Sequence, residues 1–192
     1  MPIIIAIFVL TIWTTYRLFF KENLLFDELL LKPLIWLFPI FFYVKFNFKS
    51  LGFSQKNIVK NVFIGLTVGL ILSLERIYLK SLTPNFSWII IVSALFTATT
   101  EEVFFRGFLL NSWLKFFKNP IVAMILNGLF FTLFHVPIAI FVFHYYGYNL
   151  FTYLLLNFVS GFVDIILFTY TKSIYPSISN HFVWNIFSGI FK

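Results

Sequence analysis

Long apolar segments alternate with short polar breaks along this chain. Seven of the segments approach the ~20 residues that a helix needs to cross a bilayer. The breaks are as short as KNP, YGYN and TKS, so successive helices would turn back directly. The pattern therefore predicts an all-α fold, a polytopic transmembrane helix bundle, with 1–192 as a single integral membrane domain. The predicted crossings are Pro2–Phe20, Leu29–Phe46, Ile58–Tyr78, Trp88–Trp113, Pro120–Phe143, Leu150–Tyr170 and Ile174–Phe191.

The second segment has the weakest helical pattern of the seven. Lys32, Pro33 and Pro39 interrupt it, and a proline inside a helix removes a backbone hydrogen bond. An eighth helix, short or lying at the membrane interface near Asn23–Leu31, is the alternative arrangement of this region.

Composition supports a membrane protein. The chain is 60% hydrophobic and only 11% charged, whereas soluble domains carry about 25% charged residues. The 45 residues from Asn119 to Val163 include no Asp, Glu, Lys or Arg. Because so little of the chain lies outside the membrane, we expect an integral membrane protein with the lipid bilayer as a partner and with its chemistry inside the membrane.

The net charge of +7 comes from basic residues gathered near the predicted loops. In a membrane protein such clusters contact anionic lipid head groups and set topology. No nucleic-acid partner is expected, because no basic face alternates with exposed aromatic residues. Seven Lys and Arg fall at one end of the bundle and six at the other, although the dense Lys45–Lys60 cluster favours the cytoplasmic side for its end. The chain has no cysteine, which excludes thiolate nucleophiles and Cys-ligated metals.

A few ionisable residues lie in the middle of apolar segments. A charge at mid-membrane costs at least ~2.5–3.5 kcal/mol and is by default a functional-site hypothesis. Glu102 and Arg106 are four residues apart with the acid first, the favourable order for an ion pair on one helix face. That pairing leaves Glu101 without Arg106 as a partner. The other intramembrane polar residues are His135, Asp164, His181 and Asn185.

Helix geometry predicts that four of these side chains meet. His181 and Asn185 are four residues apart, so both point to one helix face. The helical rise of 1.5 Å per residue places Glu101, His135, His181 and Asn185 at comparable depths. Each residue also has a simpler interpretation: Glu102–Arg106 as a structural pair, each His as a hydrogen-bond partner of a neighbouring helix, and Asp164 as a group that faces a water-filled cavity or pairs with a Lys.

Two chemistries fit this constellation. A carboxylate in a low-dielectric site can act as a general base on water, with one His orienting that water and a His and an Asn stabilising an oxyanion. Alternatively, Glu101, His135 and His181 supply three zinc ligands with an open fourth position. The zinc-protease motif H-E-x-x-H is absent, and spacing alone does not choose between the two.

Three motifs resemble those of a known family. EEVFFRG, from Glu101 to Gly107, resembles an E-E-x-x-x-R motif, FTLFH (131–135) an F-x-x-x-H motif, and HFVWN (181–185) an H-x-x-x-N motif. Together they are similar to the CAAX protease and bacteriocin-processing (CPBP) family of intramembrane endopeptidases, also called the ABI or CAAX prenyl protease-like family. The resemblance covers 88–190, about half of the chain.

The resemblance implies a role for each matching residue. Glu101 would be the catalytic base and His135 would help to activate the water. His181 and Asn185 would form the oxyanion hole. Glu102, Arg106 and Phe131 would be supporting residues, the mechanism would need no metal or other cofactor, and Asp164 is not part of the pattern.

Three functions from different classes follow. The first is an intramembrane endopeptidase that cleaves a membrane-associated or lipidated peptide or protein, in a bacterial cell membrane. The second is a bacteriocin self-immunity or scaffold protein that acts by binding. The third is a transporter or proton relay, which predicts helices broken at mid-membrane, and there is little Gly or Pro near Glu101 to support it.

Overall fold

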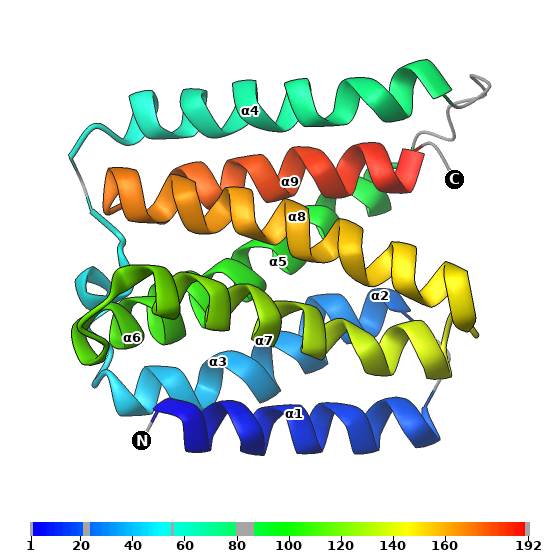
Figure 1. The fold of residues 1–192 in the computed structure, drawn as a ribbon, viewed down its shortest axis with the longest axis horizontal. Coiled ribbons are helices and arrows are strands. Elements are labelled where there is room, and N and C mark those ends of the chain that lie inside the picture. Colours follow the sequence, from blue (N-terminus) through cyan, green and yellow to red (C-terminus); the bar gives the residue numbers. More distant parts are fainter. Residues whose placement is uncertain (1, 21–23, 55, 80–86, 191–192) are drawn as a thin grey trace.

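The computed structural model describes residues 2–20, 24–54, 56–79 and 87–190, and this part of the chain is helical with no strand. The long helices lie side by side as a bundle (Figure 1), which confirms the predicted all-α fold. The elements are α1 (Pro2–Phe19), α2 (Leu24–Phe26), the π-helix η1 (Asp27–Leu31), α3 (Lys32–Tyr43), the 3-10 helix η2 (Phe48–Leu51), α4 (Ile58–Leu79), α5 (Trp88–Glu102), the π-helix η3 (Val103–Leu110), α6 (Asn111–Phe116), α7 (Pro120–Phe141), α8 (Gly147–Thr171) and α9 (Tyr175–Ile190).

Four helical runs within the described residues are long and apolar enough to cross a membrane: Pro2–Phe19, Trp88–Phe116, Pro120–Phe141 and Gly147–Thr171. A shorter apolar stretch, Ile58–Leu74, lies in α4. The count of seven crossings therefore stays a prediction.

The region expected to hold either a weak second crossing or an extra short helix forms one helical run. α2, η1 and α3 follow one another without a break from Leu24 to Tyr43, so the predicted short helix is continuous with α3, and its position at the membrane interface stays a prediction. Asn23, the predicted start of that helix, lies outside the described residues, as does Phe191 at the predicted end of the last crossing.

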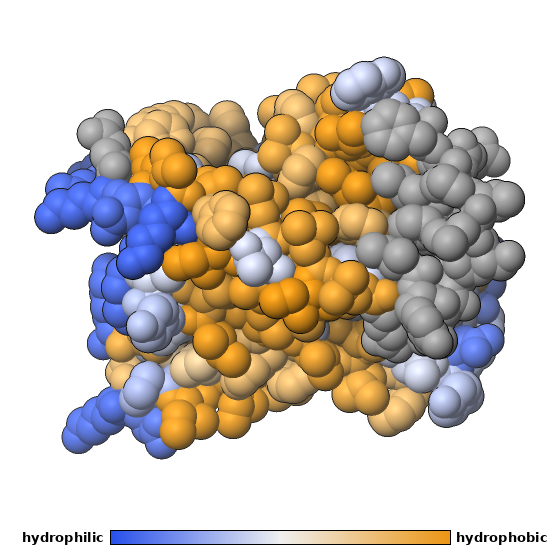
Figure 2. All heavy atoms as spheres, turned by 90° about the horizontal axis from the view of Figure 1, so that it is seen from above, coloured by the Kyte–Doolittle hydropathy of each residue, from blue (hydrophilic) through white to orange (hydrophobic). Residues whose placement is uncertain are grey.

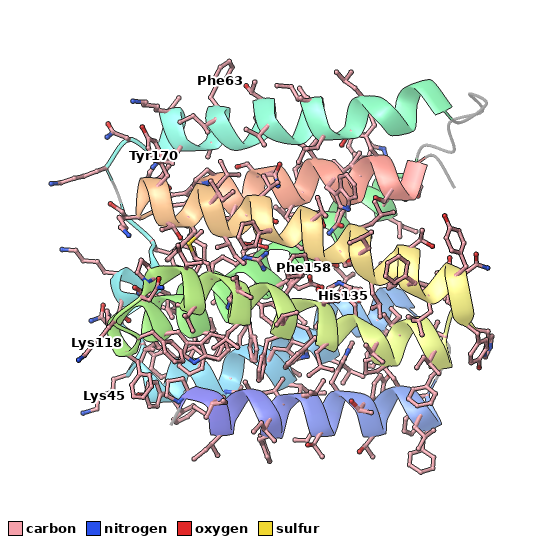
Figure 3. The ribbon with its side chains drawn as sticks, viewed as in Figure 1. Lys45, Phe63, Lys118, His135, Phe158 and Tyr170 are labelled. Carbon is pink, nitrogen blue, oxygen red and sulfur yellow. The ribbon has the colours of Figure 1, made fainter. Side chains whose placement is uncertain are left out.

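The surface is that of a protein surrounded by lipid. Hydrophobic residues cover the middle of the face in Figure 2, and hydrophilic residues collect toward its ends. Large apolar side chains face outward, including Phe63 on α4 with 69% of its surface exposed. Lys45 and Lys118 lie at one end of the bundle (Figure 3). These features, with the four apolar helices, identify an integral membrane protein.

Two glycines bring α4 against α9, the helix that carries His181 and Asn185. A Cβ added at Gly65 would lie 2.2 Å from the backbone oxygen of Pro176, and one at Gly69 would lie 2.9 Å from that of Asn180. Gly65 and Gly69 form a G-x-x-x-G spacing, which lets two membrane helices approach closely.

An aromatic core lies next to the buried polar groups. It joins α3, η3 and α7, and neighbouring ring centroids are 5.0–5.8 Å apart in tilted or edge-to-face contacts, which are favourable arrangements for aromatic pairs. Its members are Trp36, Phe104, Phe105, Phe131 and Phe134.

The helix that contains the E-E-x-x-x-R motif changes its hydrogen-bonding pattern at that motif. α5 ends at Glu102 and η3 begins at Val103, and all eight residues of η3 are buried. Asn127 of α7 donates a hydrogen bond of 2.9 Å to the backbone oxygen of Phe105 in η3. π-helical turns often occur at functional sites, and the sequence pattern gave no sign of this one.

Candidate active site

Glu101 lies at the centre of a cluster built from four helices. Its side chain is buried at the end of α5. Oε2 is 3.8 Å from Nε2 of His135 on α7 and 3.7 Å from Nε2 of His181 on α9. Oε1 accepts a hydrogen bond of 2.5 Å from Nζ of Lys32 on α3. Three of the four residues predicted to meet therefore lie together, with both histidines next to Glu101.

Both histidines are oriented by their other ring nitrogen. Nδ1 of His135 is 2.8 Å from the backbone oxygen of Phe131. Nδ1 of His181 is 2.8 Å from Oε1 of Glu102. A carbonyl and a carboxylate only accept hydrogen bonds, so each Nδ1 carries the hydrogen. Nε2 of each ring is thereby directed toward Glu101, and in a neutral ring that nitrogen has a free lone pair.

Glu102 connects Arg106 to His181. The predicted ion pair is present, with 3.2 Å between Oε2 of Glu102 and Nε of Arg106, both fully buried. The same carboxylate holds His181 through its other oxygen. Glu102 therefore lies between the two residues and contacts both.

Phe131 fills the space between the two polar groups. The Arg106 guanidinium lies 4.4 Å from the centre of its ring, in a cation–π contact, and the His135 ring is 4.6 Å away. Gly161 of α8 permits this packing, because a Cβ there would lie 2.6 Å from the Phe131 ring. Arg106 also donates a hydrogen bond of 2.7 Å to the backbone oxygen of Gly161.

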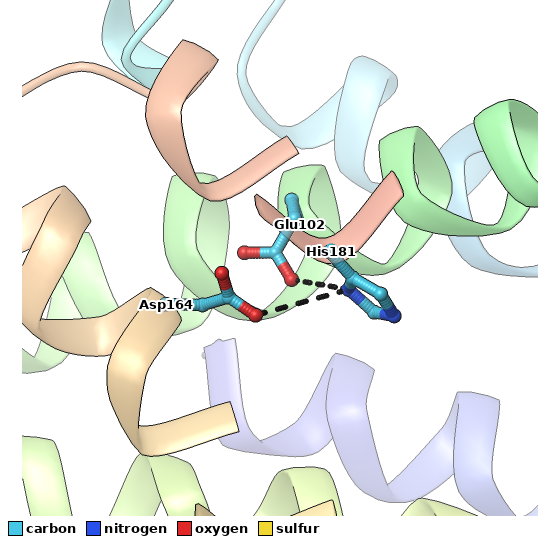
Figure 4. A group of neighbouring side chains, drawn as sticks. All are labelled: Glu102, Asp164 and His181. Carbon is cyan, nitrogen blue, oxygen red and sulfur yellow. Dashed lines mark hydrogen bonds and ion pairs between the residues drawn. The ribbon is translucent and has the colours of Figure 1, made fainter. Parts of the chain in front are cut away.

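Asp164 belongs to the same buried group. It accepts a hydrogen bond of 2.7 Å from Nδ2 of Asn180. Its Oδ2 lies 3.8 Å from Nη2 of Arg106 and 4.0 Å from Nδ1 of His181, the latter drawn in Figure 4. The sequence left two environments open for Asp164, a cavity or a pair with a Lys. The residue lines a cavity, and its cationic neighbour is Arg106.

Sequence reasoning missed Lys32. The sequence leaves Glu101 without Arg106 as a partner but does not reveal that the Lys32 ammonium bonds to it. Lys32 is also 2.8 Å from Glu28. The signal in the sequence is that Lys32 lies inside an apolar segment, where a charge is costly and points to a buried partner.

The cluster opens into a cavity of about 1280 Å³. Glu101, His135 and His181 line it, and so does Asn185, which is half-buried one helical turn after His181. The lining continues to the turn between α7 and α8, the end of the bundle opposite Lys118 (Figures 1 and 3). Polar residues of α8 spaced by three or four form one wall: Asn149, Tyr153, Asn157, Ser160 and Asp164.

Two groups of side chains have the chemistry of metal ligands. Donor atoms of Glu102, Asp164 and His181 lie within 4.8 Å of one another, but Arg106 already provides a positive charge beside both carboxylates. Glu101, His135 and His181 offer one oxygen and two imidazole nitrogens, a set that suits zinc, although Lys32 likewise bonds to that carboxylate.

The fold and the cluster define a membrane helix bundle with a buried group of acidic and basic side chains. Residues 83–187 match the family described as type II CAAX prenyl endopeptidase Rce1-like. The match covers more than half of the 192 residues, and the chain belongs to this family of CAAX-type intramembrane endopeptidases. This confirms the resemblance carried by the three motifs. No curated protein and no solved structure matches the chain significantly.

Proposed function

We propose that this protein hydrolyses a peptide bond in a membrane-associated or lipidated peptide or protein, using water activated by Glu101 and His135. Membership of a protease family supports the reaction class. The observation that carries the mechanism is the position of Glu101 Oε2, which faces two imidazole Nε2 atoms in a large cavity. A carboxylate and a neutral imidazole aimed at one region suit general-base catalysis.

In the first step, Glu101 Oε2 takes a proton from a water molecule while the water oxygen bonds to the substrate carbonyl carbon. His135 orients the same water through its Nε2 lone pair, because its Nδ1 hydrogen is held by Phe131. The carbonyl π electrons move to oxygen and form an oxyanion. In the second step the C–N bond breaks, and the proton on Glu101 passes to the leaving nitrogen.

His181 and Asn185 stabilise the oxyanion in this proposal. Nδ1 of His181 donates to Glu102, so Nε2 is also a donor only in the charged imidazolium form. Glu102 supplies negative charge beside that ring. Donors fixed before the reaction stabilise the developing charge without rearrangement. The polar wall of α8 is the route by which water reaches the site.

The test is cleavage of a library of short lipidated and amphipathic peptides by purified protein. Glu101→Gln should abolish cleavage and lower the melting temperature less than Glu102→Gln does, because Lys32 keeps Glu28 as a close partner at 2.8 Å, whereas Glu102 holds Arg106 and His181 at once. Glu102→Gln is the matched control. It removes one member of a buried pair, which costs ~3–5 kcal/mol, so it should lower the melting temperature. Wild-type turnover by Glu101→Gln would rule out the proposed base, and peptide binding without cleavage by the wild type would favour the binding function.

Zinc is the alternative way to activate the water. Glu101, His135 and His181 would hold the ion, which when bound would supply a Lewis acid for water and carbonyl. We favour the metal-free form because Lys32 and Arg106 already neutralise the acidic groups.

Elemental analysis of active, chelator-treated protein tests this choice. The expected result is full activity without stoichiometric zinc. Loss of activity with the metal, and its return when zinc is restored, would replace the metal-free mechanism with the three-ligand site.

A further inference from the structure

We infer that Lys32 is a positioning residue for Glu101: its ammonium fixes Oε1, so that Oε2 is the oxygen presented to both histidines and to the substrate water. The inference rests on the proposed function, in which Glu101 is the base. Lys32 lies outside residues 83–187, where the family match falls. The N-terminal part of the chain therefore contributes to the site and does not only pack against it.

The surroundings of Lys32 leave its ammonium little freedom. The residue is 4% exposed, and Nζ contacts Glu101 at 2.5 Å and Glu28 at 2.8 Å. It also lies 5.0 Å from the ring centre of Trp36 and 5.9 Å from that of Trp13, within the range of a cation–π interaction. Two carboxylates and two aromatic rings hold the charge in one place.

A second buried ion pair, Arg17 with Asp27, lies next to Glu28 on the side away from Glu101 in the series of charges. Glu28 accepts a hydrogen bond of 2.8 Å from Thr97 of α5 and lies 3.8 Å from Arg17. Arg17 and Tyr16 of α1 both bond to Asp27. Acidic and basic groups thus alternate from α1 through η1 to Glu101, and each charge in the series has an opposite neighbour.

The two oxygens of the Glu101 carboxylate have different surroundings, and this difference depends on Lys32. Oε1 is bonded to Lys32, while Oε2 has no hydrogen-bond partner among the described residues and is buried. A carboxylate released at Oε1 would be free to rotate and to present either oxygen. An error of about 1 Å in the placement of a reacting group lowers rates ~10²-fold, so we expect Lys32 to affect turnover more than substrate binding.

A purely structural ion pair between α3 and α5 predicts a different result. Such a pair would make stability and activity fall together in every variant, regardless of what occupies the space of the ammonium. Positioning predicts that a cation placed at Oε1 restores turnover, whether it is attached to the chain or diffuses in through the cavity that Lys32 lines.

The experiment compares Lys32→Ala, Lys32→Arg and Lys49→Ala with a fluorogenic amphipathic peptide that the wild type cleaves. Lys49 is exposed and is the matched control. We expect Lys32→Ala to lower kcat ~10²-fold with little change in KM, and Lys32→Arg and Lys49→Ala to stay near wild type. Ethylammonium should restore part of the lost kcat in Lys32→Ala, whereas the neutral 1-propanol should not. Melting temperatures are measured on the same preparations.

Two outcomes would overturn the inference: unchanged kcat in Lys32→Ala, or a loss that neither Arg nor ethylammonium repairs and that follows the melting temperature. If Lys32→Ala does not fold, Lys32→Gln keeps a donor without the charge, and near-wild-type kcat in that variant would overturn it equally. Glu101→Gln separates the two proposals. If it is inactive and Lys32→Ala is fully active, only the role of Lys32 falls, and if it remains active, both fall.

Discussion

At the scale of single residues, the site depends on side chains that serve two neighbours at once. Glu102 holds both Arg106 and His181. Phe131 contacts Arg106 with its ring and His135 with both its ring and its backbone oxygen. A change at such a residue therefore alters packing and chemistry together, and only a residue with fewer contacts can separate the two effects.

A comparison of Asn185 with His181 can separate the effect on chemistry from the effect on packing. Asn185 is half-buried at the cavity wall, whereas His181 is buried and bonded to Glu102. Asn185→Ala should lower kcat about 10²–10³-fold with little change in KM or melting temperature, the loss expected for one oxyanion donor. His181→Ala should lower kcat and the melting temperature, because Glu102 loses a buried partner.

Single-turnover rates of both variants and of the double variant, with melting curves, check this prediction. The double variant should lose much less than the product of the two single losses, because in the proposed mechanism both donors serve one oxygen atom. An unchanged rate in Asn185→Ala would remove that residue from the proposed oxyanion hole.

At the scale of elements, the position of α9 depends on its contact with α4. The obstacles that a Cβ would meet at Gly65 and Gly69 are backbone atoms as well as side chains, so no rotamer change relieves them. The two helices can accept a larger residue only by moving apart, and α9 would carry His181 with it.

Gly69→Leu should therefore lower both stability and turnover. Overpacking of this kind costs ~1–3 kcal/mol, and displacement of α9 should reduce kcat at least ~10-fold, given the sensitivity of reaction rates to placement. Leu70→Phe is the matched control, because it adds bulk to an exposed position of the same helix. Equal melting temperatures and rates in the two variants would show that α4 does not fix α9.

At the scale of the whole molecule, the cavity extends toward the end of the bundle opposite the lysine-rich end, which is the end that carries Lys45 and Lys118. Lys45 and Lys118 lie at one end (Figure 3), whereas the cavity lining extends to the turn between α7 and α8 at the other. Arg17 and Lys32 are buried and paired with acids. If these two buried charges are left out of the count, the remaining basic residues favour the lysine-rich end as the cytoplasmic one, and this orientation stays a prediction.

Cysteine labelling in intact cells tests this architecture. The chain has no cysteine of its own, so any labelling of a single-cysteine variant comes from the introduced residue. Lys118→Cys and Asn149→Cys, both at exposed positions, should react with a membrane-impermeant thiol reagent from opposite sides of the membrane, because α7 lies between them and is long enough to cross. Labelling of both from the same side would contradict a crossing by α7.

The sequence by itself determined the helices, the membrane environment and the family. Apolar runs interrupted by short polar breaks leave few alternatives in a solvent that cannot satisfy backbone groups, and each of the three motifs lies within one continuous helical run. Spacing along one helix also predicted the Glu102–Arg106 pair, which the structure contains. The same spacing did not reveal the π-helical turn at Val103–Leu110.

Tertiary structure decided which helices face one another. Lys32 meets Glu101 across 69 residues of sequence, and Glu102 meets His181 across 79. Periodicity fixes the face on which a side chain lies, but not the helix opposite that face. It could therefore mark Glu101, His135, His181 and Asn185 as residues at one depth, yet it could not supply Lys32 as a partner or explain Asp164. Those contacts follow from close approaches such as that at Gly161, where the absence of a side chain on α8 lets Arg106 and Phe131 pack beside the site.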